Sequence, residues 1–225
     1  MKAELVLALD VDSISRARYF VNKLYPKIKM FKVGPRLFIT AGPDVIRFIR
    51  GKKAEVFLDL KLHDIPHTVA EAVRQAVRLK VRMLTLHISG GSQMLEAAAK
   101  ASKDEAARLG VKRPFLIGVT VLTSQKAQPR SVLKLAKAGI AAGLDGVVCS
   151  AREVKLLRKR LGGKFLIVTP GIRAQHAPKI DQKRTATAEE AVKAGSNYLV
   201  IGRPILSAAD PLREASALIA ACRKN

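Results

Sequence analysis

The sequence predicts an α/β protein in which eight parallel β-strands alternate with α-helices in a closed (β/α)8 barrel. Eight short apolar runs alternate along the chain with segments whose apolar residues recur at helical spacing. Strands that alternate with helices form parallel sheets, and eight such units in 225 residues favour a closed barrel over an open, doubly wound sheet. No shift in composition marks a linker, so we expect one domain covering residues 1–225.

The eight apolar runs are expected to be strands buried on both faces. They are rich in Val, Ile and Leu, which is typical of parallel sheets covered by helices. The expected strands cover residues 5–9, 30–34, 56–60, 83–87, 115–121, 146–149, 165–168 and 198–201.

Capping residues predict where the helices begin. Ser13 precedes apolar residues at helical spacing, and Pro211 follows Asp210 as the first residue of the last helix. Three pairs match the capping box, namely Thr68 with Glu71, Ser150 with Glu153 and Thr187 with Glu190. Helices are therefore expected over residues 13–24, 45–49, 68–80, 92–109, 131–142 and 150–161, and from residues 187 and 210 onward.

The composition predicts a cytoplasmic protein with a packed core. Hydrophobic residues make up 48% of the chain and charged residues 26%, unlike a disordered segment. The apolar runs are far shorter than a membrane span, and the N-terminus has no signal-peptide layout. Cys149 and Cys222 are the only cysteines, which fits reduced thiols rather than a disulfide framework. No membrane partner is expected.

The net charge of +23 predicts an anionic partner. Forty-one Lys and Arg residues stand against eighteen Asp and Glu residues. Phosphorylated metabolites and nucleic acid both fit this charge. Aromatic residues make up only 4% of the chain and form no basic-aromatic stretch, so we expect weak nucleic-acid contact and no specific nucleic-acid partner.

The densest group of chemically active side chains follows the third expected strand. Asp59 and Lys61 are two residues apart and so point to the same side of a strand, while Asp64 falls in the loop shaped by Pro66. An exposed salt-bridge cluster is the plain alternative. However, the apolar run beside these charges shields them from water, and shielded charges that perturb one another's pKa values are typical of functional sites.

Active sites of (β/α)8 barrels lie at the C-terminal ends of the strands, often with phosphate bound after strands seven and eight. The loops after those two strands contain Gly171–Arg173 and Gly202–Arg203; glycine lets backbone N–H groups approach an anion, and arginine supplies a forked donor. Taken alone, Lys32 fits an exposed edge strand and His87 an interior histidine. All residues at the expected strand ends are Asp10, Lys32, Asp59, Lys61, Asp64, His87, Thr123, Arg173, Gly202 and Arg203.

Motifs occur in order from Asp10 to Asp210: Lys32-Val33-Gly34, Asp59-x-Lys61-x-x-Asp64-Ile65-Pro66 with Thr68, Thr169-Pro170-Gly171-Ile172-Arg173, Asp181-Gln182-Lys183-Arg184 and Ile201-Gly202-Arg203-Pro204. Together they resemble the orotidine 5′-monophosphate decarboxylase family over nearly the whole chain. The acid-lysine-acid motif alone is shared with sister barrels that act on sugar phosphates. The resemblance implies that orotidine 5′-monophosphate loses carbon dioxide to give uridine 5′-monophosphate in pyrimidine biosynthesis, without metal or organic cofactor.

The resemblance also implies roles for the motif residues. Lys61 would protonate C6 of the pyrimidine as the carboxylate leaves, with Asp59 beside that carboxylate. In a homodimer, the partner's site would receive Asp64, Ile65 and Thr68. The substrate-binding residues would be Asp10 and Lys32 at the ribose, Thr123 along the pyrimidine, and Arg173, Gln182, Gly202 and Arg203 at the phosphate.

One position departs from the family, and two other functions stay open. His67 stands where asparagine is usual, and with His63 it has a spacing that could suggest zinc, although Pro66 interrupts the helix that such a pair would need. A magnesium-dependent sugar-phosphate decarboxylase or synthase is the alternative enzyme. A catalytically inactive barrel that binds nucleic acid is the alternative of a different class.

Overall fold

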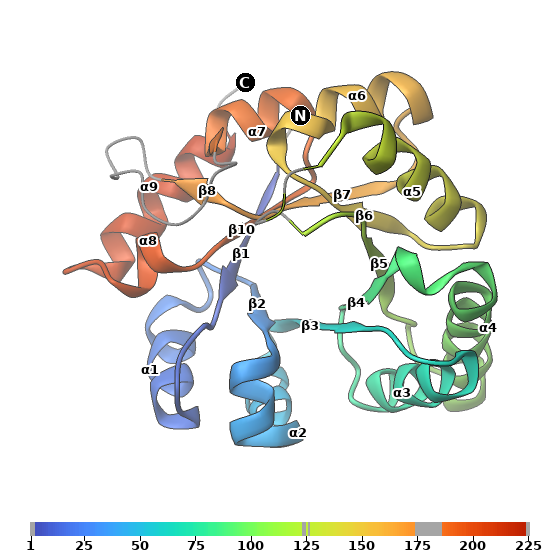
Figure 1. Ribbon diagram of the computed structural model, residues 1–225. Helices are drawn as coiled ribbons and strands as arrows, with labels where there is room; N and C mark the ends of the chain where they lie inside the picture. The colour runs from blue at the N-terminus through green and yellow to red at the C-terminus, as the bar shows by residue number, and fades with distance from the viewer. Residues whose placement is uncertain (1–2, 123–124, 126, 174–185, 224–225) are drawn as a thin grey trace.

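The computed structural model describes residues 3–122, 125, 127–173 and 186–223, with only the backbone of Arg173. Eight parallel strands close into a barrel in the order β1-β10-β7-β6-β5-β4-β3-β2, which confirms the predicted fold (Figure 1). The barrel strands are β1 (Glu4–Ala8), β2 (Met30–Val33), β3 (Glu55–Leu62), β4 (Met83–His87), β5 (Phe115–Val119), β6 (Gly146–Val148), β7 (Leu166–Thr169) and β10 (Tyr198–Ile201).

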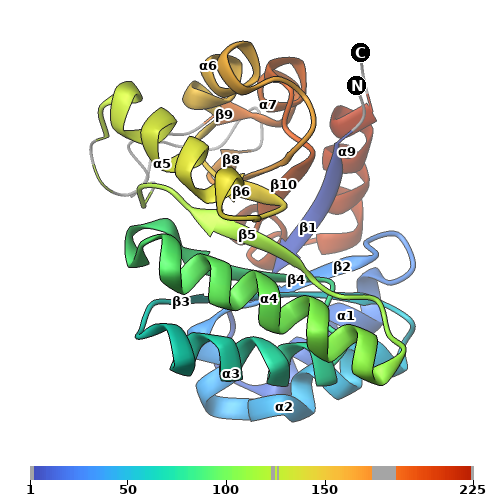
Figure 2. The same cartoon turned by 90° about the vertical axis from the view of Figure 1, so that its right-hand side faces the viewer.

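Helices surround the barrel on its outer side (Figure 2). A short pair of parallel strands, β8 (Ile172–Arg173) and β9 (Ala186–Thr187), lies outside the barrel sheet. The helices are α1 (Ile14–Leu24), α2 (Pro35–Gly51), α3 (Pro66–Arg78), the 3-10 turn η1 (Ile88–Gly90), α4 (Ser92–Leu109), α5 (Pro129–Ala141), α6 (Ala151–Leu161), α7 (Ala188–Ala194), α8 (Arg203–Leu206) and α9 (Pro211–Arg223). Within the described ranges, no helix has the length and hydrophobicity needed to span a bilayer.

Two hydrophobic layers form the core, because alternate strand residues face the barrel interior and the helices. In β3, Phe57 packs in the interior, whereas Val56 and Leu58 pack in the outer layer. Asp59 and Lys61 continue the alternation begun by Phe57, so the core packing itself directs both side chains into the mouth of the barrel. The buried interior cluster consists of Val6, Ala8, Met30, Phe57, Met83, Ile117, Val168 and Val200.

The predicted N-cap of α3 is wrong. The helix begins at Pro66 with Ile65 as its N-cap, and Glu71 forms an ion pair with Arg74 rather than closing a box with Thr68. The reason is that proline is preorganised for the first helical position and has no N–H to leave unsatisfied. The other two capping boxes, which begin α6 and α7, are confirmed.

The helix expected around residues 45–49 is longer than predicted. It runs from Pro35 to Gly51, and Gly42 interrupts it with a φ of 54° just before Pro43. These two residues hide the helical pattern in the sequence, because glycine at positive φ and an internal proline both break a helix. Strand β5 ends two residues earlier than expected, at Val119.

Candidate active site

The ends of β1, β2 and β3 bring four charged side chains into one row. Lys32 Nζ lies 3.2 Å from Asp10 Oδ1 and 3.3 Å from Asp59 Oδ2. On the other side of Asp59, Lys61 Nζ lies 2.9 Å from Oδ1. The row therefore alternates in sign as Asp10, Lys32, Asp59, Lys61. Because each charge has opposite neighbours, all four can be held in a fixed arrangement near the barrel mouth.

Exposure decreases from the ends of this row towards its centre. The side chains of Lys32 and Asp59 are 12% and 11% exposed, against 33% for Lys61 and 56% for Asp10. The expectation of an exposed edge-strand lysine at position 32 is wrong, since β2 pairs with both β1 and β3. Gly34 makes room for this lysine, because a Cβ there would lie 3.2 Å from Lys32 Nζ.

The backbone at Lys61 has an unusual conformation. Its φ is 52°, in the left-handed region that non-glycine residues rarely adopt. Over the same stretch β3 advances from Leu58 to Leu62 while β4 advances only from Leu84 to Leu86, which is an irregularity of the bulge type. Bulges re-aim side chains next to active sites, and strain at such a position persists only where the surroundings hold it.

Thr85 on β4 holds this stretch, and sequence reasoning missed it. The side chain is fully buried, and its Oγ1 accepts the Lys61 backbone N–H at 2.9 Å. The same hydroxyl donates to Asp59 Oδ1 at 2.9 Å. A single hydroxyl thus fixes both the backbone of the lysine and the carboxylate beside its ammonium. The only sequence signal is a polar residue within an apolar strand, which does not reveal its partners.

Asp59 is ionised more readily than an ordinary aspartate. Burial is the largest influence on its pKa and raises it, but the charges of Lys32 and Lys61 and the hydrogen bonds from Lys61 and Thr85 together lower the pKa below its usual value. The carboxylate is therefore negative at neutral pH although it is almost completely enclosed.

Asp10 and a further predicted residue, Arg203, line one pocket of about 320 Å3 between the β1–α1 loop and α8. Arg203 is exposed, and Gly202 lies so close to Asp10 that a Cβ there would be 3.5 Å from Asp10 Oδ2. The ends of β1 and β10 thus meet here, because these two strands pair directly.

The loop between β3 and α3 directs its side chains to solvent in the single chain. Asp64, Ile65 and Thr68 are all exposed, and Ile65 retains 65% of its accessible surface. Asp64 Oδ1 accepts the backbone N–H of Ile65 at 2.7 Å. The fold therefore brings Asp59 and Lys61 together, whereas Asp64 is exposed and forms no ion pair with the row in the described part of the chain.

The remaining predicted residues are only partly described. Thr123 and Gln182 lie outside the described residues, and Arg173 is described as a backbone position in β8. The His63 and His87 rings lie beside the lysine end of the row, with their centroids 5.5 Å apart. Burial, with the charges of His63 and Lys61, lowers the pKa of His87. No group of three or more metal-binding side chains occurs within the described ranges.

A closed (β/α)8 barrel with fixed carboxylate and ammonium groups at its strand ends belongs to the class of barrel enzymes that perform acid–base chemistry on anionic substrates. The model of the orotidine 5′-phosphate decarboxylase / HUMPS family matches residues 3–218. The chain is a member of that family.

Curated relatives and solved structures agree with this membership. An orotidine 5′-phosphate decarboxylase of Moorella thermoacetica is 44% identical, with 97% of this chain and 92% of the relative covered. One from Vibrio cholerae is 45% identical, with 92% and 93% covered. The crystal structure of the Lactobacillus acidophilus orotidine 5′-phosphate decarboxylase superposes with a TM-score of 0.87 at 35% identity, covering 99% of this chain and 100% of that one.

Proposed function

We propose that this protein decarboxylates orotidine 5′-monophosphate to uridine 5′-monophosphate in pyrimidine biosynthesis. The observation that carries the proposal is the row Asp10–Lys32–Asp59–Lys61 in a chain that belongs to this family. Curated relatives at 42–45% identity are named orotidine 5′-phosphate decarboxylases, which favours this activity over a sugar-phosphate enzyme of the same barrel type.

The chemical step requires a proton donor beside the carbon that loses the carboxylate. The bond between C6 and the carboxylate carbon breaks, carbon dioxide leaves, and the electron pair stays on C6. Lys61 Nζ then gives a proton to C6, and the neutral amine recovers a proton from water. A fixed ammonium stabilises the negative charge as it develops, which is the main task when no adjacent group can delocalise that charge. The proposal needs neither a metal ion nor an organic cofactor.

Asp59 has two effects in this scheme. It holds Lys61 Nζ at 2.9 Å, and it is a second negative charge where the substrate carboxylate would lie. Lys32 and Asp10, at the other end of the row, are proposed to bind the ribose hydroxyls. Thr123 is proposed to lie along the pyrimidine. Arg173, Gln182, Gly202 and Arg203 are proposed to bind the phosphate, whose binding energy can then order the site.

We propose that the functional unit is a homodimer. Asp64, Ile65 and Thr68 are exposed in the single chain, so all three side chains are accessible to a partner subunit. In a two-fold dimer the same loop of each subunit would reach the partner's site. Asp64 would then add a negative charge near the partner's lysine. The whole chain, residues 1–225, is proposed to act as one catalytic domain in the cytoplasm.

Absorbance spectroscopy tests the proposed activity. Purified protein with excess EDTA should remove the ultraviolet absorbance of orotidine 5′-monophosphate and yield uridine 5′-monophosphate. A matched sample with a 3-keto-gulonate phosphate and Mg²⁺ should show no turnover. Activity on the sugar phosphate alone, abolished by EDTA, would support the magnesium-dependent alternative instead.

A further inference from the structure

One side of the barrel wall carries basic residues almost without acidic ones. Between Pro114 and Ile180 the sequence contains only two acidic residues, Asp145 and Glu153, and neither lies free on the surface. Asp145 is held by Arg113 through two hydrogen bonds of 2.6 and 2.7 Å, and Glu153 is buried and caps α6. The helices in this part of the chain, α5 and α6, therefore have no exposed carboxylate to neutralise their basic residues.

These basic residues form two stripes. Arg130, Lys134 and Lys137 recur at helical spacing on α5, opposite the buried residues of that helix. Helix α6, which packs against α5 (Figure 2), has a second stripe opposite its buried residues, formed by Arg152, Lys155 and Lys159. Arg160 and Lys164 extend the second stripe. We call the eight exposed residues Arg130, Lys134, Lys137, Arg152, Lys155, Lys159, Arg160 and Lys164 the basic surface.

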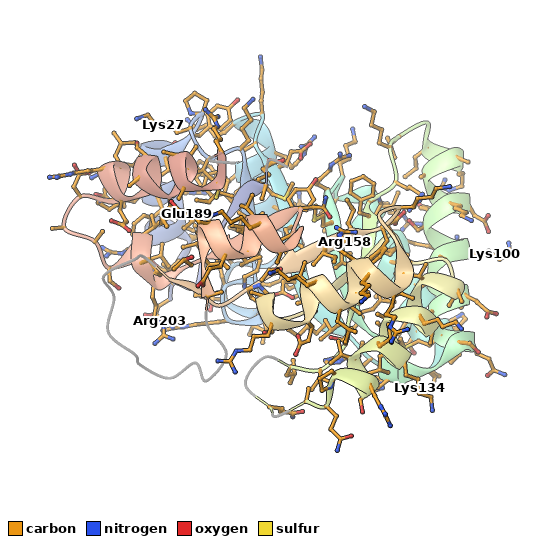
Figure 3. All side chains as sticks on the ribbon, turned by 90° about the horizontal axis from the view of Figure 1, so that it is seen from above. Lys27, Lys100, Lys134, Arg158, Glu189 and Arg203 are labelled. Carbon is orange, nitrogen blue, oxygen red and sulfur yellow. The ribbon has the colours of Figure 1, made fainter. Side chains whose placement is uncertain are left out.

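The basic surface is not used to hold the fold together. None of its eight side chains forms an ion pair with an acid in the described part of the chain. Arg158 shows the contrast: it is half-buried on the same helix and donates to the carbonyls of Phe165 and Gly195 (Figure 3). On α4, by comparison, Lys100 is paired with Asp104 at 2.7 Å. Lys134 projects outward from α5 (Figure 3).

The basic surface fits an extended polyanion better than a small ligand or a membrane. Each stripe extends about 10 Å along its helix, so no single phosphate could contact all eight side chains. The exposed large apolar residues of the described chain are Tyr19, Ile39, Ile65 and Leu109, and none lies on α5 or α6. A membrane-surface helix needs such residues. Neither helix contains an aromatic residue for base stacking, so contacts would be to the phosphate backbone.

We propose that the basic surface binds the phosphate backbone of nucleic acid without sequence preference. The binding is independent of the decarboxylase site, because the surface lies on the outer wall of the barrel and shares no residue with the row Asp10–Lys32–Asp59–Lys61. Nucleic-acid binding would account for part of the positive charge that a small phosphorylated substrate does not require.

The test measures binding of a fluorescein-labelled single-stranded RNA of mixed sequence by fluorescence anisotropy over a range of salt concentrations. One variant combines Lys134→Gln, Lys137→Gln, Lys155→Gln and Lys159→Gln. The control variant combines Lys23→Gln, Lys29→Gln, Lys52→Gln and Lys53→Gln, which removes the same charge from exposed positions on or beside α1 and α2, across the barrel from α5 and α6. Thermal unfolding verifies that both variants fold.

We expect the wild type to bind RNA with an affinity that falls steeply with salt. The α5/α6 variant should bind at least about tenfold more weakly, with a slope of log K against log salt reduced by about 3, since each lost phosphate contact contributes about 0.7. The control variant should stay within about threefold of the wild type, because distant exposed charges are screened. Equal weakening in both variants, no RNA binding by the wild type, or binding to phosphatidylserine vesicles that outlasts RNA binding at raised salt would each overturn the proposal.

Discussion

At the scale of single residues, the candidate site depends on one hydroxyl as much as on its charges. Lys61 has a φ of 52°, which costs on the order of 1–3 kcal/mol for a residue other than glycine. The hydrogen bond from its backbone N–H to Thr85 Oγ1 helps to hold that conformation. Because Thr85 also donates to Asp59, one side chain links the backbone of the lysine to the carboxylate that holds its ammonium.

Replacing Thr85 tests whether this residue positions Lys61 without contributing to nucleotide binding. Thr85→Val preserves the shape of the side chain but removes both hydrogen bonds, so we expect kcat to fall about 10- to 100-fold through misplacement of Lys61. Binding of uridine 5′-monophosphate, measured by calorimetry, should change by less than about threefold, since no proposed phosphate contact is altered.

Thr85→Ser is the matched control, because it retains the hydroxyl. It should keep most of the activity of the wild type. If the valine and serine variants had the same kcat, Thr85 would have only a packing role.

At the scale of helices, α3 and α4 are joined by a buried carboxylate. Glu105 on α4 is 2% exposed and accepts from Arg78 on α3 at 2.7 Å. It also accepts from Arg108 at 2.7 and 3.0 Å. Hydrogen bonds from Arg108 and then Arg78 lower the pKa of Glu105 from 4.5 to about 2. This contact anchors the helix that follows the catalytic strand.

The lowered pKa predicts a pH-dependent contribution to stability. The unfolded chain binds a proton at Glu105 near pH 4.5 and the folded chain only near pH 2, so the stabilisation is complete above about pH 5 and decreases as the pH falls. Glu105→Gln should lower the midpoint of thermal unfolding by several degrees at pH 7. The difference from the wild type should narrow between pH 5 and pH 3, as followed by circular dichroism. A difference that stays constant with pH would show that the ionised form has no special role.

At the scale of the whole molecule, the sequence predicts the secondary structure better than the contacts between distant residues. The eight strands and two capping boxes were predictable because apolar spacing and capping are encoded within a few residues. The hydrogen bonds between Thr85 and the residues Asp59 and Lys61 could not be predicted from the sequence. They join residues on neighbouring strands and depend on the irregular pairing of β3 with β4. The position of Asp64 relative to a partner also cannot follow from one chain.

Mixing two inactive variants tests whether the site is shared between subunits. Lys61→Ala and Asp64→Asn should each be nearly inactive alone. After unfolding and refolding together, half of the dimers should be mixed, and each of these should contain one intact site. About a quarter of the wild-type activity should therefore return if Asp64 serves the partner's lysine. If Asp64 instead acts within its own subunit, the mixture should show no more activity than the two variants measured separately.

Lys61 is proposed to stabilise the developing charge at C6 and then to protonate that carbon. The most direct measurement is kcat for orotidine 5′-monophosphate with wild type and Lys61→Ala in excess EDTA, together with binding of uridine 5′-monophosphate to both. We expect kcat to fall by about 10⁴-fold or more, because the variant loses both the proton donor and the nearest positive charge, while nucleotide binding persists. A variant that binds the nucleotide and retains kcat within about tenfold of the wild type would show that Lys61 is not the proton donor.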